Sequence, residues 1–168
     1  MFTRIVVPLD GSDLAAAALP TAEELARLAS VSIHLVRVLD TISLAKLAGY
    51  PVYGTFVEVS ALMESLRNEE AVGAAHLRAV KREIEERGLT ATMALEQGDP
   101  AEEIVAATRP GDLVVMSTHG RGGLGRWFMG SIAEEVVRRA TVPVMLVRTA
   151  TQASHERKPL VPAAAMLS

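Results

Sequence analysis

Residues 112–137 read DLVVMSTHGRGGLGRWFMGSIAEEVV, and the fold prediction rests on this stretch. Its first six residues have the near-continuous apolar character of a strand that is covered on both faces of a parallel sheet. Five glycines follow between Ser117 and Ser131, so the backbone there can approach a ligand closely. Gly130 and Ser131 then begin a helix, where free N–H groups, the helix dipole and a serine hydroxyl together suit a phosphate group.

Similar apolar runs occur elsewhere in the chain. The expected buried strands are Phe2–Leu9, Val31–Leu39, Asp112–Ser117 and Val142–Arg148. A fifth run, Thr90–Glu96, alternates strictly between apolar and polar residues, which is typical of a half-exposed edge strand. Pro143 cannot donate a ladder hydrogen bond, so the last strand is expected at the opposite edge.

Helical patterns lie between these strands. Ser12 or Asp13 is expected to cap a helix that runs to Ala29, with a kink near Leu19 because Pro20 removes a backbone hydrogen bond. A longer helix is expected from about Glu58 to Arg87, a third with Asp99 at its N-cap, Pro100 at N1 and Glu102 at N3, and a fourth from about Ser131 to Ala140.

The alternation of five strands and four helices predicts a three-layer α/β domain with a parallel sheet. Ligands of such sheets bind beyond the carboxyl ends of the strands, where the strand order reverses. The segments expected there are Pro8–Ser12, Val38–Asp40 and the glycine-rich loop after Ser117. The long connection Asp40–Val57 is either a binding loop or a segment that packs back on the domain or on a second subunit.

Two familiar phosphate-binding motifs fit this loop poorly. Residues 120–125 match GxGxxG, but the helix does not begin within the motif and no acidic strand end follows about 20 residues later. A Walker A motif is excluded because the chain has no Gly-Lys-Ser/Thr.

A different signature fits over a long stretch. The pattern Ser117-x2-Gly120-x9-Gly130-Ser131 resembles the ATP-binding signature of the universal stress proteins, with Ser117 in place of the first glycine. The likeness extends over residues 2–148 and includes VVPLDGS, QGDPAEEIV and VPVMLV. It implies one domain over residues 1–148 and an open five-stranded sheet of order 3-2-1-4-5 in a Rossmann-like adenine-nucleotide-binding domain. Residues 149–168 contain two prolines and no helical or strand period, so we expect a flexible C-terminal tail there.

The resemblance also implies a binding site. The base and ribose would contact residues at the ends of three strands, and the triphosphate would lie against Gly130, Ser131 and Ile132. The full set of implied ATP-binding residues is Pro8, Leu9, Asp10, Val38, Met116, Ser117, His119, Gly120, Arg121, Gly123, Gly130, Ser131 and Ile132. The implied ligand is ATP, or ADP or AMP, with Mg2+ or Mn2+ on the phosphates.

Several of these residues also have a purely structural interpretation. Asp10 can cap the next helix, His119 can bond to the backbone of its turn, and Arg121 can remain solvated in its loop. Ser117 would either crowd the ribose or donate a hydrogen bond to the nucleotide.

The sequence favours a nucleotide-dependent regulator or sensor of the stress response over an enzyme, because no catalytic constellation accompanies the phosphate loop. Two alternatives stay open: a slow ATP hydrolase, and a dimeric stress protein that has lost nucleotide binding. The resemblance implies a homodimer through residues 142–148.

Composition narrows the class of protein further. A net charge of −3 and a pI near 5.8 argue against a nucleic-acid partner. The chain has no cysteine, no apolar run near the ~18 residues of a membrane span, and no secretory signal at its start. We therefore expect a cytoplasmic protein without a membrane partner.

Overall fold

The computed structural model describes residues 2–41, 59–118 and 130–148. In these ranges the strands are β1 (Arg4–Pro8), β2 (Ser32–Asp40), β3 (Ala91–Gly98), β4 (Asp112–Ser117) and β5 (Val144–Val147). The helices are α1 (Asp13–Ala16), α2 (Leu19–Ala29), α4 (Val59–Glu86), α5 (Pro100–Ala106) and α6 (Ser131–Arg139). The predicted tail and most of the predicted connection after Asp40 lie outside the described residues.

The five strands form one parallel sheet of order β3-β2-β1-β4-β5, as predicted. Its central strands are apolar runs whose side chains are buried on both faces, and β4 is buried at all six positions. The alternating strand β3 and the proline-preceded strand β5 occupy the two edges, so both edge predictions are confirmed.

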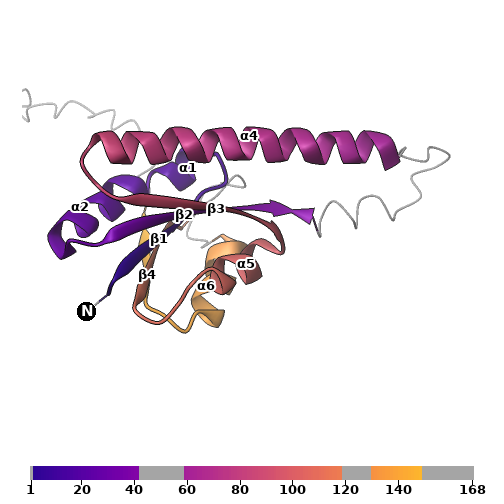
Figure 1. The fold of residues 1–168 in the computed structure, drawn as a ribbon. Helices are drawn as coiled ribbons and strands as arrows, with labels where there is room; N and C mark the ends of the chain where they lie inside the picture. Colours follow the sequence, from indigo (N-terminus) through magenta and orange to yellow (C-terminus); the bar gives the residue numbers. More distant parts are fainter. Residues whose placement is uncertain (1, 42–58, 119–129, 149–168) are drawn as a thin grey trace, which may run out of the picture.

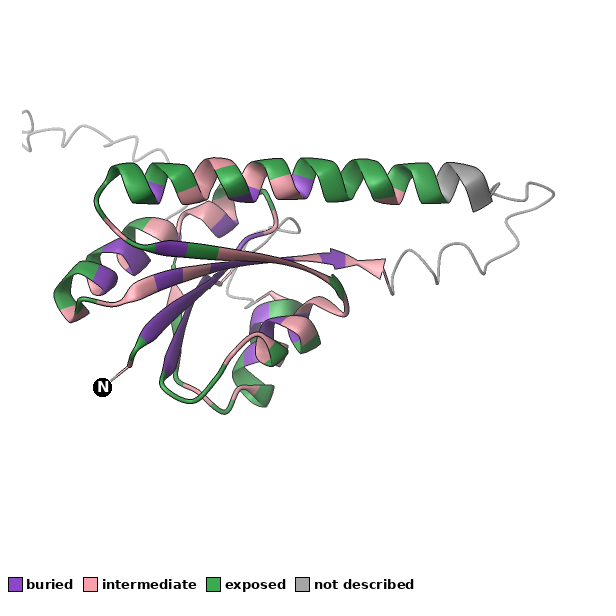
Figure 2. Cartoon of the chain, in the orientation of Figure 1, coloured by how far each residue is buried: buried purple, intermediate pink, exposed green. Residues whose placement is uncertain are grey.

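The helices cover the sheet on both faces (Figure 1). Helices α1, α2 and α4 lie over one face, where the core includes Ile5, Leu35, Leu77 and Ile84. Helices α5 and α6 lie over the other face, where Ile104 and Val136 pack on strand residues. The N-terminal part of α4 extends past the sheet on the side to which the strands point, and its described residues there are largely exposed (Figure 2).

Local caps explain where several helices begin and end. Asp99 Oδ1 accepts hydrogen bonds from the backbone N–H groups of Ala101 (3.1 Å) and Glu102 (3.0 Å), so the predicted N-cap is confirmed. Helix α4 ends before Gly88, whose φ of +80° is easily adopted by glycine alone.

The predicted single helix from Ser12 to Ala29 is wrong. The segment forms two helices, and Pro20 lies in the first turn of the second one rather than at a kink. A proline there needs no intrahelical hydrogen bond, whereas inside a continuous helix it would collide with the carbonyl group four residues earlier. Ser12 is confirmed as the N-cap of α1.

Among the described residues, no helix is both long enough and apolar enough to cross a bilayer.

Candidate functional site

The carboxyl ends of β1, β2 and β4 come together at one edge of the sheet. β1 pairs with β2 on one side and with β4 on the other, so the strand order reverses beside β1. Pro8 ends β1, Val38 lies near the end of β2, and Met116 and Ser117 end β4. The topology therefore places these four predicted site residues at the position where open α/β sheets bind ligands.

The loop after β1 is held by a small hydrogen-bond network. Asp10 Oδ1 accepts from the Ser12 backbone N–H (2.8 Å) and from the Ser12 hydroxyl (2.6 Å). Ser12 Oγ in turn accepts from the Ala15 N–H (3.1 Å) and so caps α1. Ser12, and not Asp10, therefore caps α1, and the two hydrogen bonds to Asp10 fix the orientation of the Ser12 side chain.

The helix start after β4 is the second part of the site. The Gly130 N–H donates to the Thr118 carbonyl (2.7 Å), and the Thr118 N–H donates to the Val147 carbonyl (3.1 Å). These two hydrogen bonds hold Gly130, the residue directly before α6, close to the end of β4. Gly130 is the N-cap and makes no side-chain cap hydrogen bond, so the N–H groups of the first turn can donate to a ligand.

The exposure of the predicted residues differs. Ser131 and Ile132 are exposed at the start of α6, and Pro8, Asp10 and Val38 are partly buried. Leu9, Met116 and Ser117 are buried, at 3%, 7% and 7% exposure. Leu9 and Met116 belong to the two cores, so they can face a ligand mainly through their backbone. The predicted residues His119, Gly120, Arg121 and Gly123 lie outside the described residues.

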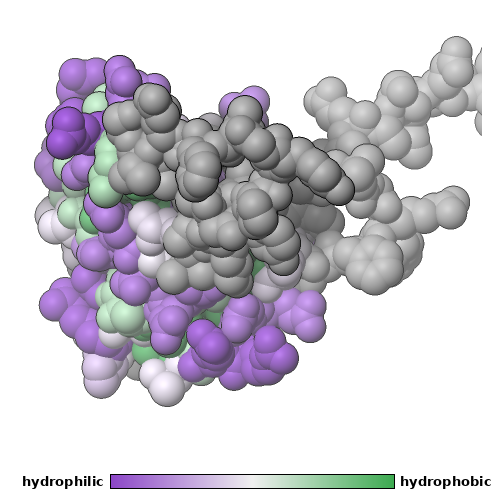
Figure 3. All heavy atoms as spheres, turned by 90° about the vertical axis from the view of Figure 1, so that its right-hand side faces the viewer, coloured by the Kyte–Doolittle hydropathy of each residue, from purple (hydrophilic) through white to green (hydrophobic). Residues whose placement is uncertain are grey.

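The surface on the side of the strands' carboxyl ends carries both hydrophilic and hydrophobic residues. Figure 3 views the molecule from the right of Figure 1, the side to which β2 and β3 point. The described surface there is mostly hydrophilic, with smaller hydrophobic areas between the polar side chains.

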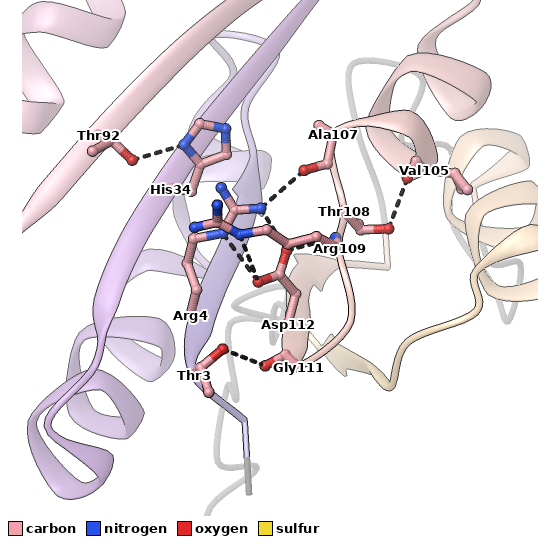
Figure 4. A network of polar contacts seen from close by, with 10 residues as sticks. All are labelled: Thr3, Arg4, His34, Thr92, Val105, Ala107, Thr108, Arg109, Gly111 and Asp112. Carbon is pink, nitrogen blue, oxygen red and sulfur yellow. Dashed lines mark hydrogen bonds and ion pairs between the residues drawn. The ribbon is translucent and has the colours of Figure 1, made fainter.

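A second polar cluster lies at the opposite end of the sheet (Figure 4). Arg4 begins β1 and donates to the two carboxylate oxygens of Asp112, at 3.0 Å from Nε and 2.5 Å from Nη2. Burial alone raises the pKa of Asp112, but hydrogen bonds from the Arg4 side chain and the Arg109 backbone outweigh it and lower the pKa. Burial, followed by the charge of Arg4, lowers the pKa of the neighbouring His34. This cluster joins β1 to β4 at their amino ends and lies away from the candidate site.

Sequence reasoning overlooked one residue near the site. Arg37 lies on β2, directly before Val38, and is only 7% exposed. Its guanidinium reaches the loop after β1: a Cβ atom added to Gly11 would lie 2.8 Å from Arg37 Nη1. The available signal was a charged residue in the middle of the apolar run Val31–Leu39, since arginine is rarely buried without a partner.

Comparison with known proteins identifies the family. The family model described as the universal stress protein family matches residues 1–148. The chain belongs to the universal stress protein family. Universal stress protein MJ0531 of Methanocaldococcus jannaschii is 34% identical over 150 residues, which cover 88% of this chain and 83% of that protein. YxiE of Bacillus subtilis is 30% identical over 156 residues, covering 88% and 100% of the two chains.

Solved structures of the family share this fold. MJ0577 matches with a TM-score of 0.72 at 25% identity, over 89% of this chain and 98% of that chain. UspA of Lactobacillus plantarum matches with a TM-score of 0.72 at 26% identity, over 88% and 98%. A universal stress protein solved in complex with cAMP matches with a TM-score of 0.54 at 17% identity, over 89% and 98%, and shows a similarity of fold.

Proposed function

We propose that this protein binds an adenine nucleotide, with ATP as the main ligand, and acts as a nucleotide-dependent regulator or sensor in the stress response. The observation that supports this most strongly is the start of α6. Gly130 carries no side-chain cap, and its N–H bond to Thr118 holds the helix start at the end of β4. A helix N-terminus in that position attracts phosphate through its free N–H groups and its dipole.

The base and ribose fit the other half of the same edge. Neighbouring strands lie about 4.8 Å apart, so β2 and β4, which flank β1, are about 10 Å apart. A nucleotide with its phosphates at Ser131 therefore extends toward Pro8, Asp10 and Val38. The binding of cAMP by a protein of this fold supports an adenine nucleotide as the ligand class.

A divalent ion would accompany the phosphates. Among the described residues no group of three His, Asp or Glu side chains could hold a metal by themselves. Mg2+ commonly takes one or two protein oxygens together with phosphate oxygens and water. The Ser131 hydroxyl at the helix start is one such oxygen, so the ion would bind together with the nucleotide.

The proposal includes a homodimer through residues 142–148. Among the described strands, β5 lies at the edge of the sheet and pairs only with β4, and Met145 on it is 38% exposed. Unpaired edge strands with apolar side chains favour pairing with another chain. A dimer would allow a nucleotide bound next to Val147, which bonds to Thr118, to influence the interface.

Isothermal titration with ATP, ADP and AMP, each with and without Mg2+, tests the proposed function. We expect micromolar ATP binding in the wild type and a loss of at least tenfold in the double variant Gly130→Ala/Ser131→Ala. Gly130 has φ −58° and ψ 146°, which alanine also adopts, so the variant should fold. The matched control is Glu102→Ala in the exposed first turn of α5, which should leave affinity unchanged.

Two results would favour the alternatives. Turnover of ATP well above ~1 per second, the low end of ordinary enzymes, would indicate a hydrolase. Binding that appears only in Ser117→Gly would indicate that the buried serine obstructs the site and that the protein acts without nucleotide.

A further inference from the structure

His34 belongs to the polar cluster at the amino ends of the strands (Figure 4), and the register of the sheet fixes its neighbours. It pairs directly with Thr92 of β3, and its Nδ1 lies 2.8 Å from the Thr92 hydroxyl oxygen. Its partner on β1 is Val6, so Arg4, two residues earlier on β1, lies on the same face of the sheet and diagonally opposite. Strand spacing and rise put the Cα atoms of Arg4 and His34 about 8 Å apart.

The charges around His34 do not balance. Among the described residues, the charged groups that act on it are Arg4, Arg109 and Asp112. Asp112 accepts two hydrogen bonds from Arg4 and lies 4.0 Å from Arg109 Nε, so a single carboxylate faces two guanidinium groups. The cluster therefore carries one net positive charge while the imidazole is neutral, and protonation of the imidazole adds another.

The other carboxylates described on this face of the sheet are too distant to compensate. Glu96 lies four residues along β3 from the partner of His34, about 13 Å away. Glu103 on α5 lies beside Gly98 at the carboxyl end of β3, about 20 Å from the same position. Helix α6 carries Arg138 and Arg139 in its last turn. Salt screens charges strongly beyond about 8–10 Å, so the positive charge next to His34 stays unbalanced.

We propose that His34 makes the edge strand β3 responsive to acid: a proton on its imidazole adds positive charge beside Arg4 and Arg109, and β3 then separates from β2 more often. β3 is the element that gives way because, among the described strands, it pairs only with β2. Arg4 and Asp112 are buried and bonded to each other on the two strands beyond β2. Opening of β3 exposes the backbone N–H and C=O groups of β2 and so creates a new sheet edge in acid.

The direction of the pH effect follows from the surroundings of the imidazole. Burial, followed by the charge of Arg4, lowers the pKa of His34 below its ordinary value of 6.5, and the opposing charge of Asp112 is too weak to restore it. The open strand therefore binds the proton first, so the closed strand loses stability as the pH falls below 6.5. A unit charge about 8 Å from another changes an equilibrium constant about two- to threefold even at the dielectric constant of water.

Hydrogen exchange of the full chain at about pH 7.5 and about pH 5.5, corrected for intrinsic exchange rates, tests the proposal. In the wild type, the opening of the β3 amides that bond to β2 should increase about threefold or more at the lower pH. His34→Gln, whose amide can still bond to Thr92 but takes up no proton, should abolish the increase. Arg109→Met should reduce the increase. Arg82→Met removes an exposed arginine from α4, on the opposite face of the sheet, and should keep the wild-type increase.

NMR titration of the imidazole supplies a second measurement, which needs no variant at position 34. The ring of His34 should titrate below 6.5 in the wild type, and closer to that value in Arg109→Met. An acid-induced opening as large in His34→Gln as in the wild type would overturn the proposal. A ring that titrates at or above 6.5 would do the same. Equal protection of β3 at both pH values would also overturn it, because the strand would then tolerate the added charge.

Discussion

Asp112→Ala is expected to lower the free energy of unfolding by about 3–5 kcal/mol, the usual cost of breaking a buried ion pair by removing one partner. The Asp112 side chain is fully buried and accepts from Arg4 Nε, Arg4 Nη2 and the Arg109 N–H, at 3.0, 2.5 and 2.9 Å. The Arg4 side chain is only 10% exposed in the structure, so removal of the Asp112 carboxylate leaves a largely buried guanidinium with the Ala107 carbonyl as its remaining acceptor in the described residues.

Urea denaturation followed by circular dichroism measures this change, with an unchanged m-value showing that the transition itself is the same. Arg139→Ala serves as the control, because its pair with Glu135 at 3.3 Å is at least one third open to solvent on both side chains (47% and 34% exposed) and should contribute less than about 1 kcal/mol. The double variant Arg4→Met/Asp112→Leu should recover most of the loss, since no charge is left unpaired. A cost below about 1 kcal/mol for Asp112→Ala would refute the reasoning.

Three further predictions concern the fold. The pKa of Asp112 is lowered in the folded protein. The stability that the Asp112 carboxylate contributes is therefore present above its ordinary pKa near 3.8 and is lost as the pH falls through its pKa in the folded protein. The difference in the free energy of unfolding between wild type and Asp112→Asn, measured by urea titration, should shrink below about pH 4, and a constant difference would contradict this. Asp99→Ala should cost about 1 kcal/mol through the lost cap of α5, and thermal melts indistinguishable from wild type would oppose it. Gly88→Ala should cost about 1 kcal/mol from its φ of +80° alone, because no atom lies within 4 Å of the added Cβ; a stabilised variant would show that the estimate of backbone strain is wrong.

The sheet was predictable from the sequence because each strand carries a pattern tied to its place. β4 is apolar throughout and proved to be buried on both faces, whereas the alternating β3 has Met93 and Leu95 against the core. The proline before β5 excluded a central position. These patterns depend only on burial, which the order of apolar residues records directly.

Features that depend on three-dimensional contacts could not be predicted. The break between α1 and α2 needed a choice between a kink at Pro20 and a new helix beginning there, and both satisfy the local rules. Arg37 lies close to both Gly11 and Gly73, which are far apart in the chain. The pairing of Arg4 with Asp112 joins residues 108 positions apart, and no sequence pattern connects the two residues.

For the site, the sequence identified the strand ends and the start of α6, because topology alone brings Pro8, Met116 and Ser131 to one edge. It also named Ser12 as a cap of the next helix, which is confirmed, but it left the role of Asp10 open between ligand contact and capping, and in the structure Asp10 accepts from the Ser12 N–H and hydroxyl. The roles predicted for residues 119–123 stay predictions.

Hydrogen exchange with and without saturating ATP and Mg2+ tests the central claim most directly. The amides of residues 131–133 in the uncapped first turn of α6 should exchange more slowly with nucleotide, because phosphate oxygens accept their hydrogen bonds. The amides of Ala101 and Glu102, already bonded to Asp99 at the start of α5, should not change. Nucleotide binding without slower exchange at residues 131–133 would contradict the placement of the phosphates at α6.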